Sequence, residues 1–219
     1  MPVQHFFATL FAAVLLAFST AVSASGNSDD PRRVIEEAVT RMTDRLIEQR
    51  DELNQDASKV RALVNEELDT LVDFRRITRM VMGSYFSQAS NDQRVRFMEV
   101  FRTSLVNTYA SGVTLYDGQE VTVLPLRDAD RRGDYARVRM QFNTDSGQQV
   151  PIHYTLFQRD NQWRVINVHV SGLDLGDTFR RQFAQAMNAN GDDIDAVIAS
   201  WSASDAGLDE AAEQFKNEL

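Results

Sequence analysis

The sequence predicts an α+β fold, in which helices pack on one face of a curved antiparallel sheet of about four strands. Two observations carry this prediction. Up to Asp117-Gly118, apolar residues recur every three or four positions, as in amphipathic helices, whereas from Val121 to Val170 they alternate with polar residues, as in strands. The helical spacing returns after Asp177. Helices that are segregated from a run of strands are typical of this class.

The first 24 residues have the pattern of a secretory signal peptide. They carry no Asp, Glu, Lys or Arg, and positions 6–18 are apolar apart from Thr9. Val22 and Ala24 supply the small residues that a signal peptidase requires, so we expect cleavage near Ala24. The alternative is a membrane anchor that stays uncut, although the apolar run is shorter than the ~20 residues that span a bilayer.

Composition limits what the rest of the chain can do. We expect one domain over residues 25–201, followed by an acidic tail over residues 202–219. The formal net charge is −9, so the protein should be repelled by nucleic acid and by anionic lipid surfaces, and we expect no nucleic-acid partner. Because the chain has no cysteine, neither a disulfide nor thiolate chemistry is expected.

Four helices are expected ahead of the strands. The first should run from Pro31 to about Leu53, because a capping Asp stands directly before a Pro at the first helical position. The second should begin near Ala57, and the third after Asp73, which stands at a cap position. The fourth is long and begins at Ser90-Asn91-Asp92-Gln93, which has the spacing of a capping box.

Four strands joined by short polar turns should follow, as a meander with one buried and one wetter face. Apolar residues alternate over positions 121–123, 136–142, 152–156 and 166–170. Ser171-Gly172 ends this region. A helix is then expected from about Asp177 to Gly191, and a short one carries Ile194 and Trp201.

The sequence offers few groups for catalysis or metal binding. His153 and His169 are the histidines that follow the predicted cleavage site, and each falls opposite the apolar alternation of its strand. Such a pair could bind a metal, but a third ligand at suitable spacing is missing, so two solvated histidines are the preferred interpretation. There is no nucleophile-elbow motif and no Gly-rich phosphate loop.

A curved-sheet isomerase is the enzyme class that is hardest to dismiss. It would need one Asp or Glu in an apolar pocket, where burial raises the carboxyl pKa. The predicted inward positions hold no acid, and helix capping explains Asp73 and Asp177. We therefore expect no enzyme, no metal and no organic cofactor.

The predicted inner faces carry many large apolar side chains, for which periodicity alone leaves two interpretations. A periodic apolar stripe is expected both in a packed core and in the lining of a cavity. For any single residue, the packed core is the better explanation. Met would suit a cavity that adapts to its contents.

Particular segments, in a fixed order and spacing, are more informative than the pattern. They include Asp73-Phe74-Arg75-Arg76-Ile77, Val81-Met82-Gly83-Ser84-Tyr85-Phe86, Tyr116-Asp117-Gly118-Gln119-Glu120-Val121, Pro151-Ile152-His153-Tyr154, Trp163-Arg164-Val165-Ile166-Asn167-Val168 and Phe179-Arg180-Arg181-Gln182-Phe183. Together they resemble the MlaC family, the toluene-tolerance periplasmic proteins, over roughly Pro31 to Trp201. The family often has Asp where Asn167 stands and Ile-Ser where Leu173-Asp174 stand.

The resemblance implies a monomeric periplasmic carrier of diacyl phospholipid that maintains outer-membrane lipid asymmetry. It implies two partners, an outer-membrane lipoprotein complex (MlaA-like) and the substrate-docking subunit of an inner-membrane ABC transporter (MlaD-like). The acyl chains would lie in an apolar cavity between the sheet and the helices, with the headgroup near the mouth. The expected lipid-binding residues are Phe74, Met80, Val81, Tyr85, Phe86, Phe97, Phe101, Leu105, Tyr109, Val123, Val138, Met140, Ile152, Tyr154, Ile166, Val168, Phe179 and Phe183.

Other classes stay open at this point. A periplasmic chaperone for lipoproteins would also shield acyl chains, but a more open and mostly β half-barrel would be expected. A curved-sheet enzyme would need the buried acid described above, and a packed domain would bind no lipid.

Overall fold

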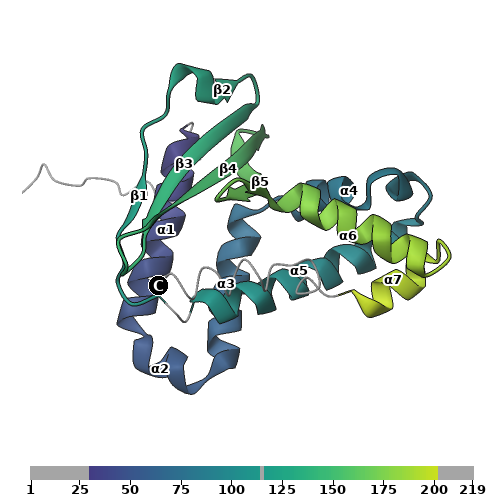
Figure 1. Cartoon of the computed structure of the whole chain (residues 1–219), viewed down its shortest axis with the longest axis horizontal. Helices are drawn as coiled ribbons and strands as arrows, with labels where there is room; N and C mark the ends of the chain where they lie inside the picture. The colour runs from purple at the N-terminus through teal and green to yellow at the C-terminus, as the bar shows by residue number, and fades with distance from the viewer. Residues whose placement is uncertain (1–29, 114–115, 202–219) are drawn as a thin grey trace, which may run out of the picture.

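The computed structural model describes residues 30–113 and 116–201 (Figure 1). The predicted signal peptide and the predicted acidic tail lie outside the described residues, and the division of the chain into these parts stays a prediction. Within the described residues, no helix is both long enough and apolar enough to cross a bilayer.

Helices make up the described chain ahead of the sheet, as predicted. The bounds are α1 Pro31–Glu48, α2 Arg50–Gln55, α3 Ala57–Leu71, α4 Phe74–Met82, the 3-10 turn η1 Gly83–Ser87, and α5 Asn91–Val113. The first predicted helix is broken in two at Gln49, whose backbone (φ −108°, ψ 15°) leaves the helical region. The apolar spacing continues across this break, which is why the sequence predicts one helix there.

The predicted helix caps are present where local sequence signals place them. The Asp73 side chain accepts a hydrogen bond of 3.0 Å from the Arg76 amide at the start of α4. At the start of α5, the Gln93 amide donates to Ser90 Oγ at 3.1 Å and the Ser90 amide donates to Gln93 Oε1 at 2.9 Å. This reciprocal pair is a capping box, and it satisfies two amides that the helix leaves free.

The sheet is antiparallel, with strand order β1-β3-β4-β5-β6 and the short β2 paired to β3. The four predicted strands correspond to β1 Val121–Val123, β3 Tyr135–Asn143, β4 Gln149–Arg159 and β5 Gln162–Val170. The strands β2 (Arg131–Arg132) and β6 (Leu173–Asp174) were not predicted, because two residues are too few to show an alternation. The 3-10 turn η2 (Asp128–Asp130) precedes β2.

A bulge in β5 changes which of its residues faces inward. Thr155 pairs with Asn167, but Leu156 pairs with Val165, so Ile166 is an extra residue on β5. The buried residue beyond the bulge is Val165, which is 2% exposed, and Ile166 is only partly buried. The predicted alternation of Ile166 with Val168 and Val170 is therefore wrong at Ile166.

The last two helices are α6 (Leu175–Ala189) and α7 (Ile194–Ser200). The N-cap of α6 is Asp174, whose Oδ1 accepts hydrogen bonds from the Asp177 amide at 3.0 Å and from Asn167 Nδ2 at 2.9 Å. The cap predicted at Asp177 is therefore wrong. The helix begins earlier because β6 ends at Asp174, which leaves one residue to close the strand and to cap the helix.

The helices meet the sheet unevenly. α1 contacts β1 and β3, and α3, α4 and α6 contact β5. Val72 forms a parallel bridge with Val165, and the Asp73 amide donates to the Val165 carbonyl at 3.0 Å, which joins the α3–α4 link to β5. α5 packs mainly against α3, α4 and α7, and Figure 1 shows one end of α5 extending beyond the sheet with α4, α6 and α7.

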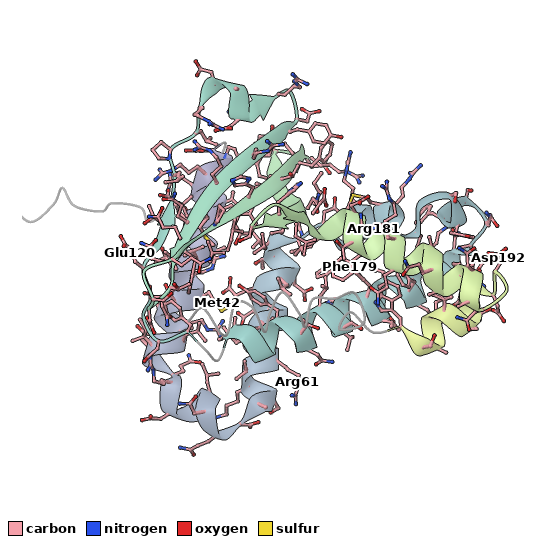
Figure 2. All side chains as sticks on the ribbon, viewed as in Figure 1. Met42, Arg61, Glu120, Phe179, Arg181 and Asp192 are labelled. Atoms are coloured by element: carbon pink, nitrogen blue, oxygen red, sulfur yellow. The ribbon has the colours of Figure 1, made fainter. Side chains whose placement is uncertain are left out.

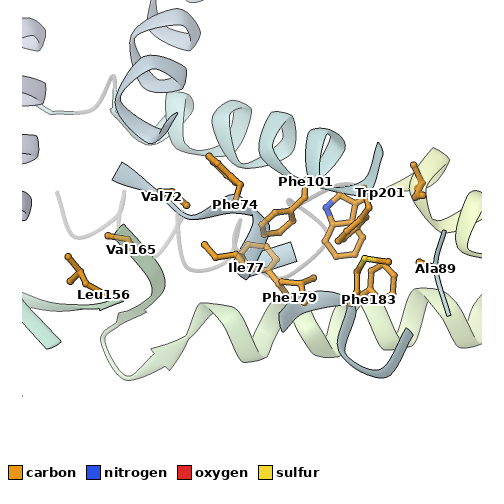
Figure 3. Close-up of a cluster of buried hydrophobic side chains, with 14 of the residues drawn as sticks. Val72, Phe74, Ile77, Ala89, Phe101, Leu156, Val165, Phe179, Phe183 and Trp201 are labelled. Carbon is orange, nitrogen blue, oxygen red and sulfur yellow. The ribbon is translucent and has the colours of Figure 1, made fainter. Parts of the chain in front are cut away.

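An aromatic cluster forms the core of this extension. Phe97 and Phe101 of α5 meet Phe183 and Phe179 of α6, and Phe97, Phe101 and Phe183 also contact the ring of Trp201 (Figure 3). Ring centroids are 4.7 Å apart for Phe97 and Phe183 and 5.1 Å apart for Phe101 and Phe179, in edge-on arrangements. Aromatic pairs favour this geometry, and none of these rings keeps more than a small accessible surface.

A second core lies at the other end of α5. It joins α1, α2, α3 and α5 through Leu46, Leu53, Val60, Leu63, Val64, Val106, Ala110 and Val113. α5 therefore belongs to two cores, one at each end.

The aromatic cluster should dominate the stability of the helical extension. Phe97→Ala should lower the free energy of unfolding by about 3–5 kcal/mol, because it leaves a cavity in a fully packed site. Val95→Ala, on the same helix at a side chain that is 49% exposed, should change it by less than about 1 kcal/mol. Urea unfolding of both variants measures the difference, and equal effects would contradict a packed cluster.

One carboxylate is buried beside the sheet. Asp130 is 7% exposed, accepts hydrogen bonds from the Arg127 side chain and amide at 2.9–3.1 Å, and lies 3.3 Å from Arg139. The Arg127 hydrogen bonds, with its charge and that of Arg139, lower the pKa of Asp130 from 3.8 to about 2.

This depressed pKa gives a pH-dependent contribution to stability. Asp130→Asn should cost about 1–2 kcal/mol at neutral pH, where the carboxylate is ionised in the folded and unfolded states. The difference from wild type should shrink as the pH falls from about 4 toward about 2, because the folded state then loses the ion pair. Urea unfolding across this range tests it, with exposed Asp128→Asn as the control. A constant difference would contradict the assignment.

Candidate functional site

The inner face of the sheet is a continuous apolar surface. Val138 of β3 lies opposite Tyr154 of β4, which in turn lies opposite Val168 of β5. The next row is formed by Met140, Ile152 and Val170. The predicted alternation of burial is confirmed for β3, whereas residues 152–155 of β4 are all partly buried. The pairing rows put apolar side chains of three strands side by side.

Coverage of this face is incomplete at its centre. Val138 and Leu156 have no accessible surface, yet Ile152, Tyr154 and Val168 are only partly buried. β4 is a central strand, so a packed core would cover Ile152 and Tyr154 completely. The inner face therefore keeps apolar surface that no neighbouring helix covers.

One stripe of α5 shows the same change from packed to uncovered. Phe97, Phe101, Leu105 and Tyr109 are four residues apart and lie on one side of the helix. Phe97 and Phe101 are 0% exposed, Leu105 is partly exposed and Tyr109 is 49% exposed. The exposure of this stripe therefore increases along α5, from the aromatic cluster toward the C-terminal end of the helix.

Two tyrosines connect these surfaces. Burial raises the pKa of Tyr109. The pKa of Tyr154 is raised mainly by burial and, to a smaller extent, by the nearby Tyr109. The phenol rings of α5 and β4 are therefore within electrostatic reach of each other, in surroundings that disfavour charge. Tyr109 keeps 49% of its surface accessible, so its ring is open to contact by a ligand beside β4.

Further apolar side chains on the helices keep accessible surface next to the two cores. They are Met42 of α1, Leu68 and Leu71 of α3, Met80 of α4 and Leu175 of α6. Figure 2 places Met42 on the inner side of α1, whereas Arg61, Glu120 and Asp192 lie at the periphery. Sequence analysis missed all of these as candidates except Met80; helical spacing puts them inward, but nothing local distinguishes them from packed residues.

The predicted lipid-binding residues divide into two groups. Several members of the first group fill the aromatic cluster. The nine buried residues are Phe74, Val81, Phe97, Phe101, Val123, Val138, Met140, Phe179 and Phe183. Nine keep accessible surface: Met80, Tyr85, Phe86, Leu105, Tyr109, Ile152, Tyr154, Ile166 and Val168. Only side chains of the second group have surface that a ligand could contact in this conformation.

The outer face of the sheet has a different character. His153 and His169 lie directly opposite each other on β4 and β5, on the wetter face as predicted, and His169 Nε2 is 3.1 Å from Asp174 Oδ2. Desolvation and the positive charge of Arg137 lower the pKa of His153. Among the described residues, no group of three or more His, Cys, Asp or Glu could hold a metal ion.

Two recesses open elsewhere on the surface. One of about 450 Å³, where α3 and α4 meet β5, is lined by charged residues that include Asp69, Arg102 and Arg164, and by one predicted binding residue, Phe74. The other, of about 240 Å³, lies between α2 and the segment that follows α5. Val72, Met98 and Phe157 also line the larger recess, so charged and apolar side chains are mixed there.

Comparison with known proteins gives consistent relatives. The family described as "MlaC protein" matches residues 36–203. The toluene tolerance protein ttg2D of Pseudomonas putida is 31% identical over 201 residues, which cover 91% of this chain and 92% of that protein. The intermembrane phospholipid transport system binding protein MlaC of Haemophilus influenzae is 21% identical, covering 90% of this chain and 91% of its own length.

A solved structure has the same fold. The phospholipid-binding protein of Ralstonia solanacearum, determined in complex with a phospholipid, superposes with a TM-score of 0.71 at 27% identity. The match covers 84% of this chain and 98% of that one. The family match, the relatives and the shared fold agree with the sequence motifs, and the chain belongs to the MlaC family.

Proposed function

We propose that this protein is a phospholipid carrier that holds acyl chains between the inner face of the sheet and α5. The observation that carries the proposal is the uncovered apolar surface, where Ile152, Tyr154 and Val168 face inward without complete cover. The printed names of the relatives support it, because one is a phospholipid transport binding protein and another was solved with a phospholipid bound.

The energetics of acyl chains explain why such a surface would be kept. Exposing a chain to water costs about 0.8 kcal/mol per methylene, so one ordinary chain costs on the order of 10 kcal/mol. A carrier must therefore enclose most of each chain. In the proposed site β4 and β5 form one wall, Leu105 and Tyr109 another, and Met80 supplies a flexible side chain that adapts to chains of different length.

The lining that we propose is narrower than the set expected from the sequence. It consists of Met80, Leu105, Tyr109, Ile152, Tyr154 and Val168, together with Met42, Leu68 and Leu71. Ile166 is displaced by the bulge, and Tyr85 and Phe86 lie in the helical extension, so they are left out. The fully buried rings of the aromatic cluster would support this lining from behind without contacting the lipid.

We propose that the protein acts without catalysis and that the bound lipid is its cargo. An enzyme of the curved-sheet type needs an acid among the inward apolar residues. Both buried acids of the described chain have basic partners elsewhere: Asp130 is bonded to Arg127, and Glu67 Oε2 lies 3.2 Å from Arg41. Neither lies among the partly exposed apolar residues, so neither is placed for proton transfer there.

The cellular role that we propose is a periplasmic shuttle for phospholipid. Lipid would be exchanged between an outer-membrane lipoprotein complex and the docking subunit of an inner-membrane ABC transporter, which is consistent with the word "intermembrane" in the name of the Haemophilus relative. The net charge of −9 favours this role, because it keeps the protein off anionic membranes and leaves docking to specific protein partners.

Charge placed on the inner face should empty the site. Ile152→Glu should lower the phospholipid retained by the purified protein at least about tenfold, because a carboxylate beside acyl chains must be desolvated. The measurement is native mass spectrometry of protein exported and purified without detergent, followed by lipid extraction. Wild type should carry a diacyl phospholipid mass and should move labelled lipid between separated vesicle populations.

The matched control is the neighbouring residue on the other face of the same strand. His153→Glu should retain lipid as wild type does, whereas Val138→Glu should unfold the protein because Val138 is fully buried. A folded Ile152→Glu protein with normal lipid would contradict the proposed lining. Wild-type protein that is free of lipid and refuses added phospholipid would contradict the function itself.

A further inference from the structure

One hydroxyl in the proposed site has only a weak partner. Tyr154 stands on β4 between Val138 and Val168, and its Oη lies 3.9 Å from the thioether sulfur of Met140. A thioether is a poor acceptor, and a hydroxyl in apolar surroundings is costly unless it is well hydrogen-bonded. Phe would fill the same volume at this position without that cost, so the hydroxyl calls for an explanation beyond packing.

A second hydroxyl lies within electrostatic reach on the opposite wall. Tyr109 ends the uncovered stripe of α5, and within residues 30–113 and 116–201 its Oη has no hydrogen-bond partner. The raised pKa values of Tyr109 and Tyr154 agree with two phenols that lie near each other among apolar side chains. The two walls thus each present one hydroxyl donor among apolar side chains.

The hydroxyl groups of two other tyrosines, Tyr85 and Tyr135, interact with charged side chains. Tyr135 Oη accepts a hydrogen bond of 2.9 Å from Arg76 on the outer face of the sheet. Tyr85 interacts with Asp192 at the far end of the helical extension. Tyr109 and Tyr154 differ from both because, within the described residues, no charged side chain engages their hydroxyl groups, and Tyr154 donates only to the Met140 sulfur.

The surroundings of the two hydroxyls determine which chemical group of a ligand can accept hydrogen bonds from them. It must accept a hydrogen bond, be uncharged, and be attached directly to long apolar chains. The carbonyl oxygen of a fatty-acyl ester meets all three conditions. A phosphate does not, because the apolar walls supply no counter-charge, and an ether oxygen is a weaker acceptor that lacks the carbonyl.

We propose, resting on the phospholipid-carrier function above, that the Tyr109 and Tyr154 hydroxyls donate to the ester carbonyl oxygens of the bound lipid and make the carrier selective for ester-linked diacyl phospholipids. The two donors set how deeply the lipid enters. Beyond them the acyl methylenes contact only apolar side chains, and the headgroup stays on the other side of the pair.

The proposal is tested by competition between two lipids that differ only in the linkage. Protein is equilibrated with vesicles that contain equal amounts of a diacyl and a dialkyl-ether phosphatidylethanolamine of the same chain length, and bound lipid is quantified by mass spectrometry. Wild type should favour the ester lipid by about three- to tenfold, the range expected for one or two neutral hydrogen bonds. Tyr109→Phe and Tyr154→Phe should each reduce the preference, and the double variant should bind both lipids equally.

A matched control and a spectroscopic readout separate this role from packing. Tyr135→Phe removes a hydroxyl from the outer face and should leave the preference unchanged. With a ¹³C-labelled ester carbonyl, the bound lipid should show a lower carbonyl stretching frequency in wild type than in the double variant. Equal binding of both lipids by wild type, or an unchanged preference in the double variant, would overturn this inference and leave the carrier function standing. Binding of neither lipid by wild type would overturn the carrier function.

Discussion

Packing around Trp201 determines how the helices of this protein are held. Phe97 and Phe101 of α5 and Phe183 of α6 contact the indole ring, and Phe179 of α6 packs edge-on against Phe101. The same core continues from these rings to the sheet, where Leu156 and Val165 belong to it (Figure 3). A second core secures the other end of α5 against α1 and α3. Along its length α5 packs mainly against α3, α4 and α7 and contacts the strands little.

The function follows from this arrangement. Apolar surface that a packed domain would bury stays accessible on β4, β5 and the middle of α5, although it costs stability when it is hydrated. In the proposed function, a lipid that occupies this surface restores the missing contacts. The hydroxyls of Tyr109 and Tyr154 are the polar exceptions among these apolar residues, and we propose that they recognise a neutral acceptor.

Much of the fold could be predicted because its signals are local. Asp73 and the Ser90–Gln93 capping box mark helix starts through neighbouring amides, and the alternation in β3 reports one buried face. The bulge at Ile166 and the cap at Asp174 depend on pairing between strands, which a single segment does not encode. The site was the hardest part to predict. Phe101 and Leu105 share one stripe, and only tertiary packing decides which of them is covered.

The most direct test of the central claim is to locate the acyl chains. Protein loaded with a phospholipid that carries bromine atoms along its acyl chains can be crystallised, and the bromines found by anomalous diffraction. The account predicts bromine positions between β4 and α5, beside Ile152, Leu105 and Tyr109. Bromine confined to the charged recess beside Arg102, or to the outer face of the sheet, would contradict it.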